Sequence, residues 1–172
     1  MAIDKIFLVG FMGSGKSTFG MQLAKQIGWD FVDLDDYIEE KEKRTITDIF
    51  ASDGEDYFRQ LETSVLFDTK TWEKTVVSCG GGTPCFNNNV DVINDLGLSI
   101  YMKLSPESLK HRLIKEKAKR PLIANLKDAE LLNFISNKLA ERSSFYESAN
   151  LIFEYSDEKE TEFIKTILKK IV

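Results

Sequence analysis

The sequence GFMGSGKST at residues 10–18 constrains the fold of this chain more than any other stretch. Gly10, Gly15, Lys16 and Ser17 fit the pattern G-x-x-x-x-G-K-[S/T]. The pattern lies between an apolar run, KIFLVG, and a helical repeat, STFGMQLAKQIG. A strand–loop–helix setting is the context in which this pattern forms a phosphate-binding loop. The motif therefore predicts a buried strand, a loop whose backbone N–H groups surround phosphate oxygens, and a helix that begins at the loop.

The loop also predicts two ligands. We expect Lys16 to reach the β- and γ-phosphates of ATP, and we expect the Ser17 hydroxyl to bind Mg²⁺. The residues expected to hold the nucleotide are Gly13, Ser14, Gly15, Lys16, Ser17 and Thr18. The predicted co-substrate is therefore ATP, with Mg²⁺ as the metal ion.

Strand-like and helical patterns alternate along the rest of the chain. The runs FVDLD, TVVSC, LSIYMKL and LIFEY predict strands at residues 31–35, 75–79, 98–104 and 151–155. Apolar residues at helical spacing predict helices between and after them, on stripes with Phe58, Leu61 and Val65, with Leu132, Ile135 and Leu139, and with Ile164, Ile167, Leu168 and Ile171. Ser105 and Pro106 predict the start of another helix. This alternation predicts one α/β domain, residues 1–172, around a mainly parallel sheet.

The composition excludes several classes of protein. The chain has 172 residues with 23 Lys and Arg against 28 Asp and Glu, a net charge of −5, so we expect neither a nucleic-acid nor a membrane partner. No apolar stretch approaches the roughly 20 residues of a membrane-spanning helix, and the N-terminus does not follow the signal-peptide pattern. Two cysteines do not make a disulfide framework. We expect a cytoplasmic protein, and a monomer, since no long apolar stripe is left over.

Two aspartates follow the second predicted strand. Asp33 and Asp35 are two residues apart in FVDLD, so a strand would turn both carboxylates to the same face. Like charges placed side by side are costly unless a cation or a proton-donating ligand separates them. One carboxylate near Mg²⁺ and one on a substrate hydroxyl would satisfy this requirement. The alternative is a solvated turn that begins at Asp35 and Asp36.

Three arginines are candidates for binding an anion. Arg59 precedes Glu62 by three residues, which fits either an oriented binding group or a surface ion pair. Arg142 extends the stripe of Ile135 and Leu139, so its guanidinium would need an anion or other acceptors at a buried position. Arg120 lies in the charged segment at residues 115–128, which is either a solvated loop or a mobile lid over the site.

The stretch TVVSCGGGTPC at residues 75–85 allows three interpretations: a metal or disulfide site, a second phosphate loop, or the floor of a substrate pocket. Cys79 and Cys85 lack the paired spacing of a zinc site, and the single His111 lies far away in sequence. Two neutral thiols are the better interpretation.

Taken together, these motifs resemble the shikimate kinase family almost from end to end. The matching parts are the phosphate loop, FVDLD, FRQLE, CGGG, KRPLI and Arg142, in that order. The resemblance implies a three-layer P-loop kinase fold with a five-stranded parallel sheet in the order 2-3-1-4-5, flanked by helices, and a mobile lid. It also implies transfer of the ATP γ-phosphoryl group to the 3-hydroxyl of shikimate, in the biosynthesis of chorismate and aromatic amino acids.

The resemblance also implies individual roles. Asp33 would help to hold Mg²⁺ through water. Asp35 would bind the substrate hydroxyls and accept the reacting proton. The other implied positions are Arg59 and Arg142 on the substrate carboxylate, Arg120 as the lid arginine, Arg112 against the adenine, and Gly80, Gly81 and Gly82 as the pocket floor.

The chain departs from the family at two positions. Cys79 stands where relatives usually carry a hydroxyl residue, and a thiol is a weaker donor. Thr161 stands where relatives often have a proline beside the adenine. Two alternatives to the family's activity remain: another small-molecule kinase of the same fold, acting on gluconate or a nucleoside monophosphate, and a module that binds ATP without turnover.

Overall fold

The computed structural model describes residues 3–117, 120 and 122–171. Its described strands form one parallel sheet in the order β2-β3-β1-β4-β5. The strands are β1 (Lys5–Val9), β2 (Asp30–Asp33), β3 (Thr75–Ser78), β4 (Leu98–Lys103) and β5 (Leu151–Glu154). The predicted strand order and parallel pairing are confirmed.

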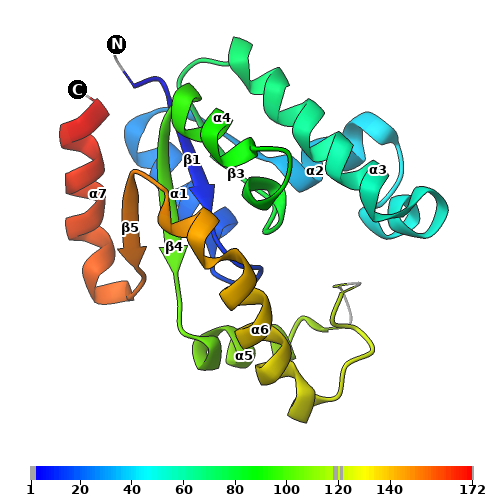
Figure 1. Ribbon diagram of the computed structural model, residues 1–172. Coiled ribbons are helices and arrows are strands. Elements are labelled where there is room, and N and C mark those ends of the chain that lie inside the picture. Colours follow the sequence, from blue (N-terminus) through cyan, green and yellow to red (C-terminus); the bar gives the residue numbers. More distant parts are fainter. Residues whose placement is uncertain (1–2, 118–119, 121, 172) are drawn as a thin grey trace.

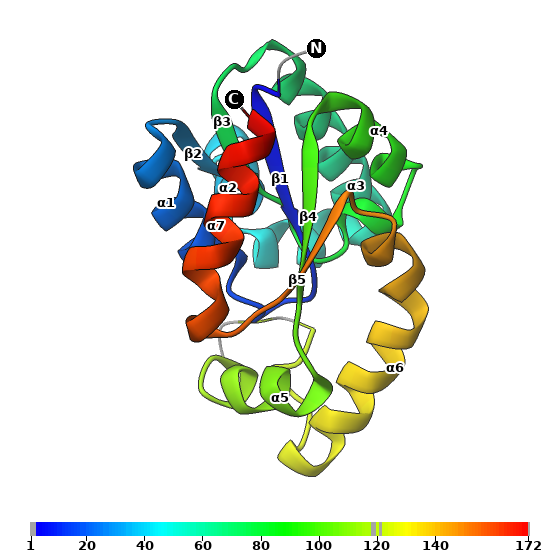
Figure 2. The ribbon, with the colours of Figure 1, turned by 90° about the vertical axis from the view of Figure 1, so that its left-hand side faces the viewer.

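Helices cover both faces of this sheet, which gives three layers (Figures 1 and 2). The helices are α1 (Lys16–Ile27), α2 (Leu34–Glu42), α3 (Ile46–Asp68), α4 (Asn89–Leu96), α5 (Pro106–Ile114), α6 (Asp128–Glu147) and α7 (Asp157–Ile171). Helices α1 and α7 lie on one face, and α2, α3, α4 and α6 pack on the other. None of the described helices is long and apolar enough to cross a membrane.

Strand β1 shows why the layers form. Its side chains alternate between the two faces, as the pleat of a strand requires. Ile6 and Leu8 pack against α1 and α7, whereas Phe7 and Val9 pack against helices on the opposite face. All four are buried, so the central strand is apolar throughout because both of its faces are covered.

Caps define the boundaries of two helices, and the start of α5 at Ser105 and Pro106 is as predicted. Gly28 ends α1 in the left-handed conformation (φ 69°), and its N–H donates to the carbonyl of Ala24. The Ser105 hydroxyl accepts the N–H of Ser108 at the start of α5, with Pro106 in the first turn. These caps fix where the chain enters and leaves the sheet.

Three sequence predictions were wrong in detail. Strand β2 ends at Asp33, so Leu34 and Asp35 begin a helix and do not extend the strand. The buried position on α6 is Leu131, and Leu132 is only partly buried. Leu168 is exposed, because the inward stripe of α7 is carried by Ile164 and Ile167. In both helices the buried residue, Leu131 or Ile167, lies next to a leucine that the sequence pattern wrongly placed in the core.

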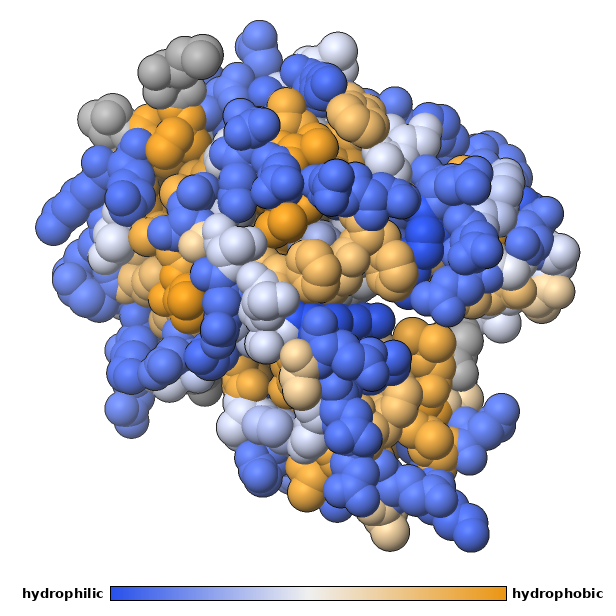
Figure 3. Space-filling view, in the orientation of Figure 1, coloured by the Kyte–Doolittle hydropathy of each residue, from blue (hydrophilic) through white to orange (hydrophobic). Residues whose placement is uncertain are grey.

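The fold places the carboxyl ends of the strands beside the ends of several helices. Strands β1 and β4 run toward α5, and α6 extends from the sheet past α5 (Figure 1). Parallel α/β sheets bind ligands at this edge. Figure 3 shows the surface hollowed between the part of the molecule that contains α3 and the part that contains α5 and α6.

Gly20 lets α1 lie close to the sheet, and replacing it should destabilise the protein. A Cβ at this position would come within 2.5 Å of Phe31 and 2.9 Å of Leu8. We expect Gly20→Ala to lower the free energy of unfolding in urea by about 1–2 kcal/mol, since overpacking outweighs the roughly 1 kcal/mol gain in helix propensity. Met21→Ala is the control, because Met21 is 53% exposed and should change stability by less than about 0.5 kcal/mol. A more stable Gly20→Ala variant would contradict this account of the packing.

Candidate active site

The phosphate loop connects β1 to α1 in the predicted manner. Gly15 stands at the start of α1 in the left-handed conformation (φ 89°), where residues with a Cβ are strained. A Cβ on Gly10 would lie 2.8 Å from the carbonyl oxygen of Met102 on β4. The two glycines that define the motif are thus required by backbone conformation and by close packing.

Lys16 is buried inside this loop. Its Nζ donates to the carbonyl oxygens of Gly10 at 2.9 Å and Phe11 at 3.0 Å. Burial lowers the pKa of Lys16 to about 8, against the opposing effect of the negative charges of Asp33 and Asp35. An anion in the loop would therefore restore the preference of Lys16 for the charged form.

A cleft of about 460 Å³ opens beside the loop, and we call it the loop cleft. Arg112 of α5 lies over the ring of Tyr155, with its Cζ 5.2 Å from the ring centroid. Ser14 is the expected nucleotide residue that does not line the cleft: it is buried beneath the loop, with its Oγ 3.2 Å from where a Cβ on Gly10 would lie. Expected residues that line the cleft are Gly13, Gly15, Lys16, Ser17, Thr18, Asp33, Arg112 and Arg120.

Asp33 links the loop to α2. Its Oδ2 accepts the Ser17 hydroxyl at 2.5 Å, and its Oδ1 accepts the backbone N–H of Asp35 at 3.0 Å. Asp33 is thus the N-cap of α2, a position that favours aspartate. This cap explains why the strand prediction failed at Asp35: the two carboxylates line the same cleft, but Asp35 reaches it from the first turn of a helix.

The negative charge of Asp35 is poorly compensated by the surrounding side chains. Burial raises its pKa to about 7, and the nearby carboxylates of Asp33 and Glu62 add to this effect, while Lys16 and Arg120 oppose it. A carboxyl group that titrates near neutrality is suited to accept a proton or to hold a hydroxyl group.

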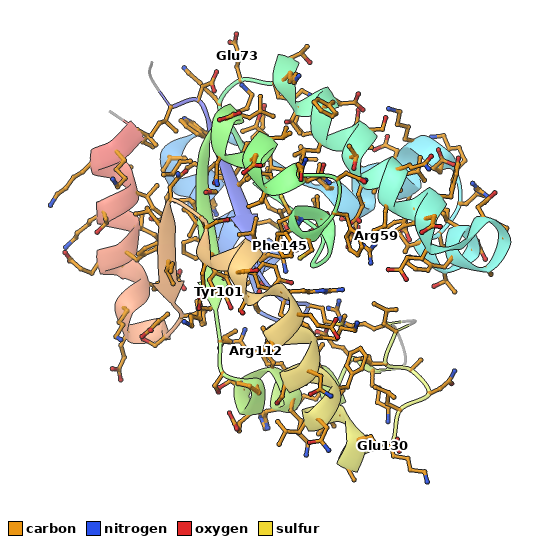
Figure 4. The ribbon with its side chains drawn as sticks, viewed as in Figure 1. Arg59, Glu73, Tyr101, Arg112, Glu130 and Phe145 are labelled. Carbon is orange, nitrogen blue, oxygen red and sulfur yellow. The ribbon has the colours of Figure 1, made fainter. Side chains whose placement is uncertain are left out.

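The second cavity lies between α3, α6 and the turn after β3, and we call it the arginine pocket. It has a volume of about 210 Å³ and contains both Arg59 and Arg142. Figure 4 shows Arg59 on α3 and Arg112 on α5, on different sides of the strand ends. The rest of its wall consists of Met12, Asp35, Glu39, Ile46, Thr47, Phe50, Phe58, Glu62, Gly80, Gly81, Gly82, Arg120 and Leu122.

The two arginines have different surroundings. Arg59 forms ion pairs with Glu62 at 2.6 Å and with Glu55 at 2.8 Å, and its Cζ lies 4.3 Å from the ring centroid of Phe86. Arg142 is only 8% exposed, and within the described part of the chain no carboxylate lies at ion-pair distance from it. A buried guanidinium for which the described residues offer no carboxylate is suited to bind an external anion.

The three glycines after β3 make room for functional side chains. A Cβ on Gly80 would lie 2.7 Å from Asp35 and 2.8 Å from Glu62. A Cβ on Gly82 would collide with the guanidinium of Arg59. Gly81 lies nearest the phosphate loop, where its Cβ would be 3.3 Å from the backbone nitrogen of Met12. Gly80, Gly81 and Gly82 therefore line the arginine pocket, and they also leave room for the polar groups that surround it. Their contact with a substrate stays a prediction.

The loop cleft and the arginine pocket meet. Both are lined by Met12, Asp35, Gly80, Gly81 and Arg120. A group bound in one cavity can therefore reach a group bound in the other at Asp35. This arrangement suits the transfer of a group between two ligands.

Arg120 lies where the two cavities join. Its Nη2 pairs with Glu116 at 2.8 Å, and its buried Nε has no hydrogen-bond partner among the described residues. Residues 118, 119 and 121 of the expected lid lie outside the described residues. The role of Arg120 and the movement of the lid both stay predictions.

Cys79 and Cys85 are free thiols, as expected. Burial raises the pKa of Cys79, and burial raises the pKa of Cys85 to about 11. The Ser78 hydroxyl, one residue before Cys79, lies 3.2 Å from the Ser17 hydroxyl and lines the loop cleft. Cys79 provides no hydroxyl, but the hydroxyl of the adjacent Ser78 lies in the loop cleft beside Ser17.

Sequence reasoning missed Phe86 and Tyr146, which contact residues that line the arginine pocket. Phe86 packs on Arg59, and the Tyr146 hydroxyl donates to the carbonyl of Gly81 at 2.6 Å. Tyr146 was detectable, because it lies four residues after Arg142 on the same face of a helix. Phe86 gave no such signal, since its contact joins segments far apart in sequence.

Comparison with known proteins agrees with this geometry. The family model described as shikimate kinase matches residues 12–172. The chain belongs to the shikimate kinase family. A relative named shikimate kinase from Azobacteroides pseudotrichonymphae genomovar. CFP2 is 40% identical over 168 residues, covering 97% of this chain and 99% of that protein.

Solved structures extend this family relationship to three dimensions. The shikimate kinase of Bacteroides thetaiotaomicron has a TM-score of 0.89 at 35% identity and covers 98% of both chains. The shikimate kinase of Acinetobacter baumannii, solved in complex with shikimate, has a TM-score of 0.85 at 32% identity, covering 97% of this chain and 92% of that one. The predicted family and P-loop kinase fold are confirmed.

The raised pKa of Asp35 gives a prediction for stability. The folded protein keeps this proton up to about pH 7, whereas an unfolded chain releases it near the ordinary value of 3.8, so stability falls as the pH rises through this range. We expect Asp35→Asn to raise the free energy of unfolding at pH 8 by about 1–3 kcal/mol, allowing for partial exposure of the side chain. Urea unfolding at several pH values measures this, and the difference should vanish near pH 4. A difference that does not depend on pH would contradict the assignment.

Proposed function

We propose that this protein transfers the γ-phosphoryl group of ATP to the 3-hydroxyl of shikimate. The observation that carries the proposal is that Arg142 and Asp35 line one small pocket. Arg142 is buried, and no carboxylate of the described residues lies at ion-pair distance from it. A substrate with a carboxylate for the arginine and a hydroxyl for the aspartate complements both groups. The complex of the Acinetobacter baumannii relative with shikimate supports this choice of acceptor.

The acceptor carboxylate would be bound by Arg59 and Arg142. Guanidinium groups bind carboxylates through two parallel hydrogen bonds, which fix orientation as well as position. The backbone N–H of Gly81 would donate to a ring hydroxyl. Residues Gly80, Gly81 and Gly82 would form the wall against which the ring lies.

The reacting hydroxyl would be oriented by Asp35. As its oxygen forms a bond to the γ-phosphorus and the bond to the β-phosphate oxygen breaks, the hydroxyl proton passes to the Asp35 carboxylate. Lys16 and Arg120 would stabilise the negative charge on the transferring group. Closure of the lid at residues 115–128 would exclude water, so that the phosphoryl group reaches the acceptor and not a water molecule.

The residues present fit a magnesium ion held partly by the nucleotide. Ser17 and Asp33 offer oxygen atoms, the ligands that Mg²⁺ prefers. Ser17 Oγ lies 2.5 Å from Asp33 Oδ2. The described residues contain no group of three or more His, Cys, Asp or Glu that could hold a metal ion, so phosphates and water would complete the coordination. When bound, Mg²⁺ neutralises charge on the phosphates. Arg112 would pack against the adenine.

We also propose that the protein acts as a monomer in the cytoplasm. Residues of one chain line both cavities, so neither depends on a partner subunit for its described walls. The two free cysteines agree with a reducing compartment.

The proposed reaction is tested by measuring ADP release with shikimate, gluconate and nucleoside monophosphates offered in parallel. We expect rapid turnover with shikimate alone, and a loss of about 10²–10⁴-fold in kcat for Asp35→Asn, because this change removes the charge and the basicity but keeps the size. Asp36→Asn is the matched control at the neighbouring, exposed position and should stay near wild type. Turnover only with another acceptor would overturn the assignment, and ATP binding without turnover would leave only a binding module.

Arg142→Lys should distinguish the binding of the acceptor in the arginine pocket from the binding of ATP in the loop cleft. We expect shikimate affinity to fall by about 10- to 150-fold, because lysine keeps the charge but loses the paired hydrogen bonds. ATP affinity should change by less than about twofold, which calorimetry with each ligand would show. Arg44→Lys is the control, since Arg44 pairs with Glu42 and Asp53 and lines neither cavity. Equal weakening of both ligands would argue against a role for Arg142 on the carboxylate.

A further inference from the structure

Tyr146 is the largest fully buried group that lines neither cavity and still contacts the pocket wall. It lies on α6, one helical turn after Arg142. Its hydroxyl donates a hydrogen bond of 2.6 Å to the carbonyl oxygen of Gly81. One residue thus touches the glycine wall from the same helix face that carries the unpaired guanidinium.

The Gly81 carbonyl is held by a side chain, whereas the carbonyls of Gly80 and Gly82 are held by backbone N–H groups. The carbonyl of Gly80 accepts the N–H of Thr83 at 3.1 Å, and the carbonyl of Gly82 accepts the N–H of Cys85 at 2.9 Å. The partners described for the Gly81 carbonyl are both side chains: Tyr146 and, at 4.0 Å, the Cys85 thiol. The turn holds the outer two peptides, and Tyr146 holds the middle one.

The same hydroxyl lies near Arg142. Burial raises the pKa of Tyr146, and the positive charge of Arg142 acts in the opposite direction. The guanidinium also lies 3.6 Å from where a Cβ on Gly81 would be. Arg142, the Tyr146 hydroxyl and the Gly81 peptide therefore form one connected group.

The ring of Tyr146 is held independently of its hydroxyl. It stacks on Tyr101 of β4, with centroids 5.1 Å apart and an interplanar angle of 30°. Figure 4 shows Tyr101 beside the end of α6 nearest the sheet. Because packing fixes the ring, removal of the hydroxyl alone should leave the aromatic contact in place.

We propose that Tyr146 is a positioning residue for the acceptor, and that its hydroxyl holds the Gly81 peptide and Arg142 in register. The inference rests on the proposed function, because it assumes an acceptor with a carboxylate on Arg142 and a ring against Gly81. Without the hydroxyl, the Gly81 carbonyl loses its strong donor, and the guanidinium lies against a peptide that is no longer held in place. The Arg142 guanidinium and the Gly81 peptide are then no longer fixed relative to each other when the acceptor binds.

The test compares Tyr146→Phe with Tyr101→Phe. The two changes remove a hydroxyl from the two rings of one stacked pair, but Tyr101 lines a separate cavity, near Leu104 and Ser143. For Tyr146→Phe we expect the KM and Kd for shikimate to rise about tenfold, the loss typical of one hydrogen bond. The KM for ATP should change by less than about twofold, and the melting temperature by a few degrees at most. Tyr101→Phe should leave both KM values unchanged.

A double variant tests the link to Arg142. In the Arg142→Lys background, Tyr146→Phe should weaken shikimate binding by less than about threefold, because the guanidinium that the hydroxyl positions is already absent. A full tenfold loss in that background would overturn the link.

Other outcomes separate this inference from the proposed function. A wild-type protein that does not phosphorylate shikimate overturns the proposed function and this inference with it. Normal wild-type turnover together with an unchanged shikimate KM in Tyr146→Phe overturns the inference alone. Equal rises in both KM values with a large fall in melting temperature would also overturn it, because they would indicate a general structural role.

Discussion

Several acidic side chains lie close together at the carboxyl edge of the sheet, and the site depends on how their charges are compensated. Two of the acidic groups there are satisfied: Asp33 accepts from Ser17 and caps α2, and Glu62 accepts from Arg59 and from Thr83 at 2.7 Å. Asp35 has no equivalent partner among the described residues, and burial raises its pKa to about 7. The fold therefore concentrates its electrostatic cost on the residue that faces both cavities, where a ligand hydroxyl can reduce that cost.

The glycines after β3 show how a short sequence can bring this charge together. Asp35, Glu62 and Arg59 come from two different helices, and each approaches the backbone of Gly80 or Gly82 more closely than a Cβ would allow. A side chain at either glycine would push functional groups apart before it touched any substrate. Glycine is therefore needed here to make room for the protein's own side chains, and it also leaves space for the acceptor.

Much of this arrangement could be predicted from the sequence, and the remainder could not, for identifiable reasons. The phosphate loop and the inward direction of Arg142 follow from local pattern, and the strand order followed from the family resemblance. The position of Asp35 did not follow, because Asp-Leu-Asp after an apolar run fits both a strand end and a helix cap. The contact of Phe86 with Arg59 joins elements distant in the chain, so only the folded structure reveals it.

The contrast between the two arginines bears on which acceptors the pocket can hold. Arg59 is neutralised by Glu55 and Glu62 and packed beneath Phe86, so it contributes fixed geometry and little net charge. Arg142 contributes a positive charge that no described carboxylate balances. One such charge matches a single carboxylate. Arg120, the other arginine of the pocket wall, already pairs with Glu116. A phosphate dianion at Arg142 would therefore leave one negative charge without a partner among the described residues, close to Asp35, in a pocket where water screens it poorly. The charges of the pocket therefore favour a monoanionic hydroxy acid over a nucleoside monophosphate, independently of its shape.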